Sequence, residues 1–196
     1  MSPPAEVLEI AGILADVCER LRLSYALGGA IAQNFWGVVR ATQDVDLLVS
    51  VPRLRFEELR GALVAERFTS LDEQENPVPL TVERMVAEER DRHVVIIARD
   101  LVKAEVFFPF LPLQHSILRR AVKLKLGSRE VPITTAEDLI LLKLAFHREK
   151  DLRDIRGILA IQKDRLDLAY LRDWAGKMLS DSHRDELERW VAQYWK

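Results

Sequence analysis

The spacing of apolar residues predicts a mixture of helices and strands up to Thr135 and helices alone after it. Apolar residues recur every three or four positions, the period of an amphipathic helix, in several stretches. These stretches cover residues 7–21, 30–36, 54–66, 136–146, 152–162, 168–179 and 185–195. Short apolar or β-branched runs, which predict strands, cover residues 25–27, 44–51, 93–98, 101–108, 122–126 and 130–133.

The turns between these runs predict how the parts are organised. Arg99-Asp100 and Gly127-Ser128 each separate two strand-like runs, which indicates two hairpins. Residues 69–89 are acidic and lack a clear period, so we expect a mobile loop with one helical piece over 82–88. We therefore predict an α/β core over residues 1–112, followed by a β-hairpin and a helical part over residues 113–196.

Two aspartates at the start of the run 44–51 are the first candidates for chemistry. Asp44 and Asp46 are two residues apart on a strand, so they point to one face, roughly 6.5–7 Å apart. Val45 and Leu47 point to the opposite face, into the core. Two-metal phosphoryl or nucleotidyl transfer needs carboxylates on a rigid element around ions about 3.5–4 Å apart. An isolated Asp-x-Asp, however, is most often a turn or the satisfied end of a strand.

A pair of glycines precedes these aspartates. Gly28 and Gly29 stand where the strand 25–27 meets the helix 30–36. A helix N-terminus offers free N–H groups to a phosphate, and glycine lets the phosphate come close. Neither the glycine pair nor the aspartate pair is a specific signal alone. Their combination is much more specific, because the glycines stand between a strand and a helix and the Asp-x-Asp begins the next strand.

Two blocks of the sequence resemble a known superfamily. Residues 28–30 (Gly-Gly-Ala) and 40–48 (Arg-Ala-Thr-Gln-Asp-Val-Asp-Leu-Leu) resemble the opening motif of DNA polymerase β-like nucleotidyltransferases, of the AbiEii and minimal-nucleotidyltransferase type. Residues 137–143, which end on a lysine, and 148–155 (Arg-Glu-Lys-Asp-Leu-Arg-Asp-Ile) resemble their second motif. The resemblance implies an α/β (α+β) fold with a small mixed sheet flanked by helices, and a helical C-terminal part.

The resemblance also implies an activity and its participants. It implies transfer of a nucleoside monophosphate from an NTP to an acceptor, with Mg²⁺ or Mn²⁺ as the metal and tRNA as a possible acceptor. It also implies the role of a toxin in a toxin–antitoxin pair, with a small antitoxin protein as its partner. Two alternatives stay open. One is an antibiotic- or small-molecule-modifying nucleotidyltransferase, for which the acidic residues Asp72, Glu73 and Glu75 would suit a cationic substrate. The other is a non-catalytic nucleotide- or protein-binding member of the fold.

Matching the motifs position by position gives the candidate residues. The metal ligands implied are Asp44, Asp46 and a third carboxylate on a later strand. Glu105 is the candidate for it, since it is the acidic residue inside the apolar run 101–108, where a charge needs a partner. The catalytic set is these three with Lys143. The implied nucleotide-binding residues are Gly28, Gly29, Arg40, Thr42, Lys143 and Asp151.

Lys143 lies in a helix that is apolar nearly all round, so its amine must find an anion. At 100° per residue, Lys143, His147, Lys150 and Asp154 fall in a stripe roughly 60° wide, with Asp151 at its border. We interpret this stripe as facing the active cleft. The alternative is an internal ion pair of Lys143 with Asp44, Asp46 or Asp151 that serves stability alone.

Composition changes this picture little. The formal net charge is -2, so an RNA acceptor would have to bind a local patch such as Arg119, Arg120, Lys123, Lys125 and Arg129. The one cysteine, Cys18, excludes an intrachain disulfide and favours a reducing compartment. The first residues lack the pattern of a signal peptide, and the longest uncharged stretch is too short and polar for a membrane span. We therefore expect a cytoplasmic protein without a membrane partner.

Overall fold

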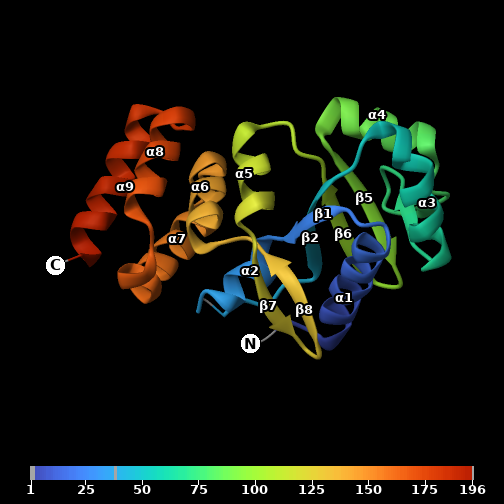
Figure 1. Cartoon of the computed structure of the whole chain (residues 1–196), viewed down its shortest axis with the longest axis horizontal. Coiled ribbons are helices and arrows are strands. Elements are labelled where there is room, and N and C mark those ends of the chain that lie inside the picture. The colour runs from blue at the N-terminus through green and yellow to red at the C-terminus, as the bar shows by residue number, and fades with distance from the viewer. Residues whose placement is uncertain (1–2, 38, 196) are drawn as a thin grey trace.

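A single mixed sheet organises the computed structural model, which describes residues 3–37 and 39–195 (Figure 1). The strands of the described residues are β1 Ser24–Leu27, β2 Asp44–Ser50, β3 Thr69–Leu71, β4 Pro77–Val78, β5 Val94–Arg99, β6 Val102–Phe107, β7 Val122–Leu126 and β8 Arg129–Ile133. Their order across the eight-stranded sheet is β4-β3-β5-β6-β2-β1-β8-β7. The carboxylate strands β2 and β6 are therefore central neighbours.

The helices flank this sheet on both sides. They are α1 Ala5–Arg20, α2 Gly29–Phe35, α3 Phe56–Ala65, α4 Val82–Arg92, α5 Pro112–Arg120, α6 Ala136–Phe146, α7 Glu149–Gln162, α8 Leu168–Met178 and α9 Asp181–Tyr194, with 3-10 turns at Arg53–Arg55 and Lys163–Arg165. Figure 1 shows α3 and α4 at one end of the molecule and α7, α8 and α9 at the other. The expected α+β architecture with a helical C-terminal part is confirmed.

The register of the sheet decides which side chains share a face. β2 pairs with β6 in parallel, with Asp44 opposite Lys103 and Asp46 opposite Glu105. Val45, Leu47 and their neighbours Ala104 and Val106 are buried on the other face. Alternation along each strand therefore sends the charged residues of both strands, with Leu48 and Phe107, toward one face and the residues between them into the core.

The hairpin of β7 and β8 belongs to the same sheet, because β8 pairs with β1 in parallel at Leu27 and Ile133. The sheet thus runs across residue 112, and the division into parts 1–112 and 113–196 stays a prediction. The hairpin itself, like that of β5 and β6, is confirmed.

Three expectations need correction. Residues 69–89 are not a loop with one helical piece, because β3 and β4 pair at the sheet edge and α4 extends to Arg92. Helix α5 was not predicted, since its apolar residues are few and Pro112 begins it. The single stripe from Lys143 to Asp154 is broken, because His147 ends α6 in the left-handed conformation (φ 51°) and α7 begins after Arg148.

Helix α6 is fixed at its start by a buried polar cluster. Thr135 caps it by accepting a hydrogen bond from the Asp138 N–H at 3.2 Å, and its hydroxyl donates to the Asp138 carboxylate at 2.8 Å. The second Asp138 oxygen accepts from the Tyr170 hydroxyl of α8. Burial raises the pKa of Asp138 above its usual value. This cluster fixes α6, and with it Lys143, against α8.

None of the helices described in residues 3–37 and 39–195 combines the length and apolar character that crossing a membrane requires.

Candidate functional site

Asp46 occupies a crowded position on β2. It lies opposite Glu105 in the register, with Asp44 two residues before it. Burial first, and then the charges of Glu105 and Asp44, raise its pKa from 3.8 to about 6, although Lys143 and Arg148 act in the opposite direction. The pKa of Glu105 is also raised, by burial and by Asp44. These like charges therefore destabilise one another unless a cation lies between them.

The two glycines make room for the Asp46 carboxylate. The Gly28 N–H donates to the Asp46 carbonyl oxygen at 2.8 Å, which ties the start of α2 to β2. Gly29 has a left-handed φ of 52°, and a β-carbon added to it would stand 1.7 Å from Asp46 Oδ2. Only glycine is compatible with this contact, since any side chain at position 29 would displace the carboxylate.

The three carboxylates share a sheet face but border two different cavities. Asp46 lines one cavity, whereas Asp44 and Glu105 line the next. As the side chains lie, no group of three or more His, Cys, Asp or Glu residues within the described ranges is arranged to hold a metal ion. The donor set nevertheless fits a hard cation, because the partly buried Asp46 and Glu105 and the exposed Asp44, on adjacent strands, supply oxygen ligands and a local excess of negative charge.

Lys143 lies in a chain of alternating charges beside this face. Its Nζ is 2.7 Å from Asp154 Oδ2 and 3.5 Å from Asp151 Oδ1. Arg148 pairs with Asp151 at 2.6 Å, and Arg40 pairs with Asp154 at 3.1 Å. Of the partners that the sequence left open, Asp151 pairs with Lys143, while the nearer partner, Asp154, was not among them.

Asp151 acts as the anchor of two cations. Its side chain is only 1% exposed. Burial alone would raise its pKa, but the hydrogen bond from Arg148 and the charge of Lys143 lower it overall. A buried anion with two cationic partners is suited to positioning Lys143 and Arg148 rather than to touching a phosphate itself.

Unlike Asp151, the predicted residues Thr42 and Arg40 do not line either cavity. The Thr42 hydroxyl donates to the Asp44 carbonyl at 3.0 Å and accepts from the Asp44 N–H at 3.3 Å, so it fixes the start of β2. Arg40 contacts Asp154, and its backbone N–H donates to Asn34. His147, from the expected stripe, contacts Glu186 of α9 at 2.6 Å and stacks on His183.

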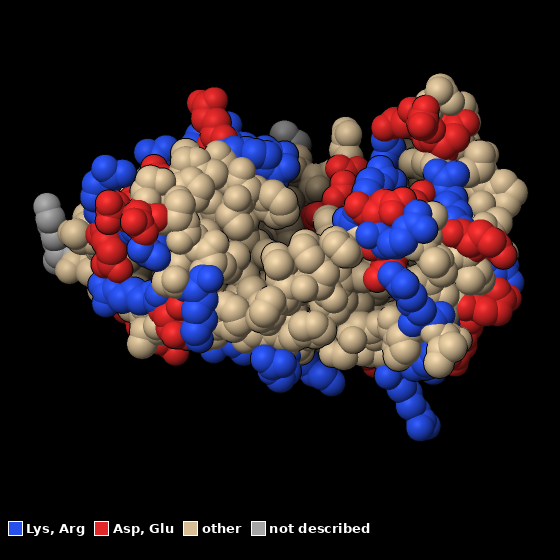
Figure 2. Space-filling view, turned by 90° about the horizontal axis from the view of Figure 1, so that it is seen from above, with Lys and Arg blue, Asp and Glu red and all other residues tan. Residues whose placement is uncertain are grey.

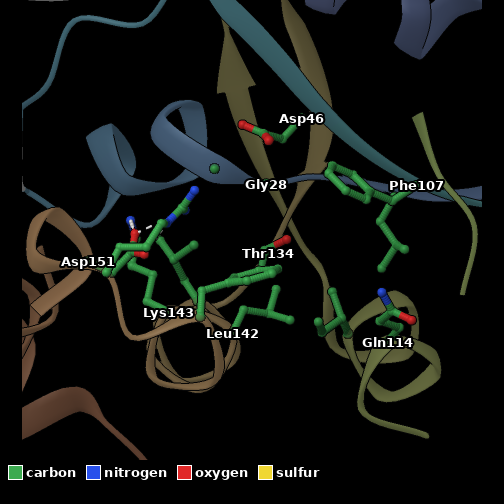
Figure 3. Close-up of a pocket in the computed structure, with 14 residues that line it drawn as sticks. Gly28, Asp46, Phe107, Gln114, Thr134, Leu142, Lys143 and Asp151 are labelled. Carbon is green, nitrogen blue, oxygen red and sulfur yellow. Dashed lines mark hydrogen bonds and ion pairs between the residues drawn. The ribbon is translucent and has the colours of Figure 1, made fainter. Parts of the chain in front are cut away.

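A cavity of about 140 Å³ brings the glycines, Asp46 and Lys143 together (Figure 3). Its polar end is formed by Gly28, Gly29, Asp46, Lys143 and Arg148. Figure 3 shows Lys143 and Asp151 on one side of Thr134, and Phe107 and Gln114 on the other. The cavity therefore has a charged end and an apolar end on either side of Thr134.

The second cavity is markedly acidic. Its lining comprises Asp44, Asp72, Glu73, Glu75, Glu88 and Glu105, with Arg84, Arg92 and Lys103 as the only basic residues in its lining. The acidic stretch expected to be a loop thus lies beside two of the candidate metal ligands. Figure 2 shows a hollow beside the C-terminal helices with acidic atoms on one rim and basic atoms on the other.

Sequence reasoning missed several residues of the first cavity. Arg148 stands in the second motif but received no role, and Phe107, Gln114 and Phe146 were not considered. A signal for Gln114 was present, because Pro112 followed two residues later by glutamine is typical of the first turn of a helix.

The basic residues between Arg119 and Arg129 did not form one patch, since Arg120 contacts Glu137 and Asp138 while Arg129 contacts Asp16.

The fold matches known structures. A nucleotidyltransferase-like antigenic protein from Paracoccidioides brasiliensis aligns over 98% of this chain and 95% of its own, with TM-score 0.55 and 17% identity. The solution structure of the antibiotic-resistance factor ANT(2'')-Ia aligns over 94% of this chain and 95% of its own, with TM-score 0.57 and 15% identity. Its complex with adenylyl-2''-tobramycin aligns over 89% of this chain and 97% of its own (0.55, 13%).

These likenesses show that the chain has the nucleotidyltransferase fold. No protein-family model matches the sequence, and no curated protein matches it significantly.

Gly29→Ala tests the contact between Gly29 and Asp46. The added methyl must displace the carboxylate and the backbone must keep a positive φ, so we expect the free energy of unfolding to fall by about 1–3 kcal/mol. Gly61→Ala in α3 is the control, because nothing lies within 4 Å of its added β-carbon. We expect that variant to gain about 0.5–1 kcal/mol. Equal melting curves for the two variants would contradict the contact.

Asp46→Asn tests the crowding of the carboxylates. Because the pKa of Asp46 is raised from 3.8 to about 6 in the folded protein, its charged form opposes folding. Above about pH 6, in chelator-treated buffer, we expect the variant to be more stable than the wild type. Its free energy of unfolding should be larger by about 1–3 kcal/mol.

That gain should shrink between about pH 6 and pH 4, where the wild-type carboxyl becomes protonated, and should vanish below. Urea unfolding of both proteins across this range measures it. A gain that increases as the pH falls would show that the Asp46 charge is stabilised by its surroundings.

Proposed function

We propose that the protein is a divalent-metal-dependent nucleotidyltransferase. The observation that carries the proposal is the first cavity, where Gly28, Gly29 and Asp46 meet Lys143 and Arg148 across the space between β2, α2 and α6. Exposed backbone, one carboxylate and two cations in a single cavity suit a triphosphate. The nucleotidyltransferase fold supports the same reading.

Lys143 and Arg148 would bind the triphosphate. Both line the cavity, and both are held by Asp151, so their charges are positioned before a nucleotide arrives. Arg148 is half-exposed, whereas Lys143 is buried. Charge-assisted hydrogen bonds to phosphate are stronger than neutral ones, and preorganised donors need no rearrangement in the reaction.

Asp44, Asp46 and Glu105 would hold the divalent ion, Mg²⁺ or Mn²⁺, which supplies Lewis acidity at the α-phosphate when bound. In the reaction, a hydroxyl oxygen of the acceptor forms a bond to the α-phosphorus, the bond to the bridging oxygen breaks, and pyrophosphate leaves. The hydroxyl proton passes to solvent. Lys143 and Arg148 would offset the charge that develops on the leaving pyrophosphate.

The second cavity favours a cationic small molecule as the acceptor. Within the described residues, Asp72 and Glu73 of its lining take part in no salt bridge and are not among the proposed metal ligands. An RNA backbone would be repelled there, because nucleic-acid binding depends on neutralising phosphates with lysine and arginine. A related fold, the antibiotic-resistance factor ANT(2'')-Ia, was determined with adenylyl-2''-tobramycin.

The other candidates rest on the sequence resemblance. Transfer to tRNA, a role as a toxin and an antitoxin partner stay predictions. A non-catalytic role is disfavoured by the presence of all three carboxylates on one face.

Transfer of label from nucleotides tests the proposed function. The protein is incubated with each α-labelled NTP and Mg²⁺, together with either total tRNA or tobramycin as a cationic probe. We expect label on the cationic acceptor and none with Asp46→Asn. Label on tRNA alone would replace the proposed acceptor with RNA. No transfer and no nucleotide binding would overturn the function.

Lys143→Met separates nucleotide binding from structural pairing. The substitution keeps the bulk of the stem, and Asp151 and Asp154 retain Arg148 and Arg40 as partners. We expect the affinity for a non-hydrolysable NTP, measured by calorimetric titration, to fall by roughly 10–100-fold. The exposed Lys125→Met is the control. Unchanged affinity with a shifted melting point would remove Lys143 from the site.

A further inference from the structure

The far end of the first cavity from Lys143 is almost entirely apolar. Its walls there are Leu48 and Phe107, which pair between β2 and β6, and Ile117 of α5. The apolar residues Leu139, Leu142 and Phe146 line the cavity from α6, the helix of Lys143, and the Phe146 ring lies 5.3 Å from the Arg148 guanidinium carbon. Phe146 is 64% exposed, so its ring is accessible at the edge of the cavity. A flat aromatic ligand gains by lying against such walls. With the triphosphate at the charged end, as the proposed function has it, the nucleobase reaches this apolar end.

Gln114 is a polar side chain at that end, and its orientation is fixed. It is the third residue of α5, and its Oε1 accepts hydrogen bonds from the backbone N–H groups of Phe110 and Leu111 at 2.9 and 3.0 Å. Two donors facing one atom require that atom to be the oxygen, because an NH₂ group there would meet two N–H groups. The residue is 8% exposed.

Gln114 therefore offers only donors to the cavity. Its oxygen has both lone pairs engaged by the backbone, and Figure 3 shows its nitrogen on the cavity side. The hydroxyl of Thr134 lies elsewhere, beside Gly28, where it stands 3.7 Å from an added β-carbon. An exocyclic amine at the Gln114 end would thus meet a donor without an acceptor from this side chain.

We infer that Gln114 selects nucleotides whose base presents a carbonyl oxygen to it, which makes GTP and UTP preferred over ATP and CTP. Guanine presents O6 and uracil presents O4 as acceptors, whereas adenine and cytosine present amino groups at the equivalent positions; N7 is an acceptor in both purines and does not distinguish them. A site built to hydrogen-bond one group discriminates against a ligand that leaves the buried donor unpaired. The inference rests on the proposed function.

The first test keeps the wild-type protein and varies the nucleotide. Calorimetric titration compares non-hydrolysable analogues of GTP, ITP, ATP, UTP and CTP. We expect GTP, ITP and UTP analogues to bind about tenfold more tightly than ATP and CTP analogues, because inosine keeps the 6-carbonyl of guanine and lacks its 2-amino group. Binding of no analogue would overturn the proposed function, whereas equal binding of all five would overturn only the selectivity.

Gln114→Glu tests the residue itself. One carboxylate oxygen can still accept from Phe110 and Leu111, which preserves the helix cap, while the other replaces the donor with an acceptor. The added charge weakens binding of every nucleotide, so the readout is the ratio of GTP to ATP affinity. We expect this ratio to fall by about tenfold or to reverse.

Gln193→Glu, at an exposed position of α9, makes the same chemical change away from the cavity and should leave the ratio unchanged. Melting curves check that the Gln114 variant keeps the cap. A folded Gln114→Glu protein with the wild-type ratio would show that Gln114 only caps α5 and would overturn the inference.

Discussion

The burial of Asp46 beside Glu105 is the constraint on which the rest of the site depends. Parallel pairing of β2 and β6 places the two carboxylates opposite each other, and Asp44 adds a third charge on the same face. The raised pKa of Asp46 shows that the folded protein keeps this charge at a free-energy cost. Gly29 is a consequence of that placement, because the carboxylate occupies the space where its side chain would be. A carboxylate held at such a cost does not stabilise the fold, which favours a role in a functional site.

The ion pairs around Lys143 complement that negative face. Arg40, Lys143 and Arg148 carry three positive charges against the two negative charges of Asp151 and Asp154, which leaves a surplus of one. Buried ion pairs seldom stabilise a fold more than apolar residues of the same size would, so stability alone does not account for the network. Its effect is to join the segment before β2 to α6 and α7 and to hold two cations at the charged end of the cavity. An internal ion pair and a phosphate contact are thus compatible roles of Lys143.

The sequence predicted the elements whose patterns are local and strong. The run from Asp44 predicted β2 because an apolar run with acidic residues at one end is typical of a buried strand, and the Gly28-Gly29 pair marked the start of α2. The edge strand β4 and its neighbour β3 are two and three residues long, so tertiary pairing alone defines them. The helical stripe failed beyond Phe146 because a left-handed residue at His147, which needs no glycine, ended α6. Gln114 escaped notice because its role depends on a cavity formed by residues distant in sequence.

The two cavities that border the carboxylate face have opposite chemistry, and in the proposed function this asymmetry would separate the nucleotide from the acceptor. The first supplies Lys143 and Arg148 to an anionic ligand and apolar walls to a flat ring. The second is lined mostly by carboxylates and would repel that same ligand. In the proposed function, the triphosphate would therefore bind with its charge toward Lys143. The proposed acceptor, in the acidic cavity, would approach the α-phosphate from the direction of Asp44 and Glu105, away from the cations that would bind the pyrophosphate. The charge distribution thus separates donor from acceptor.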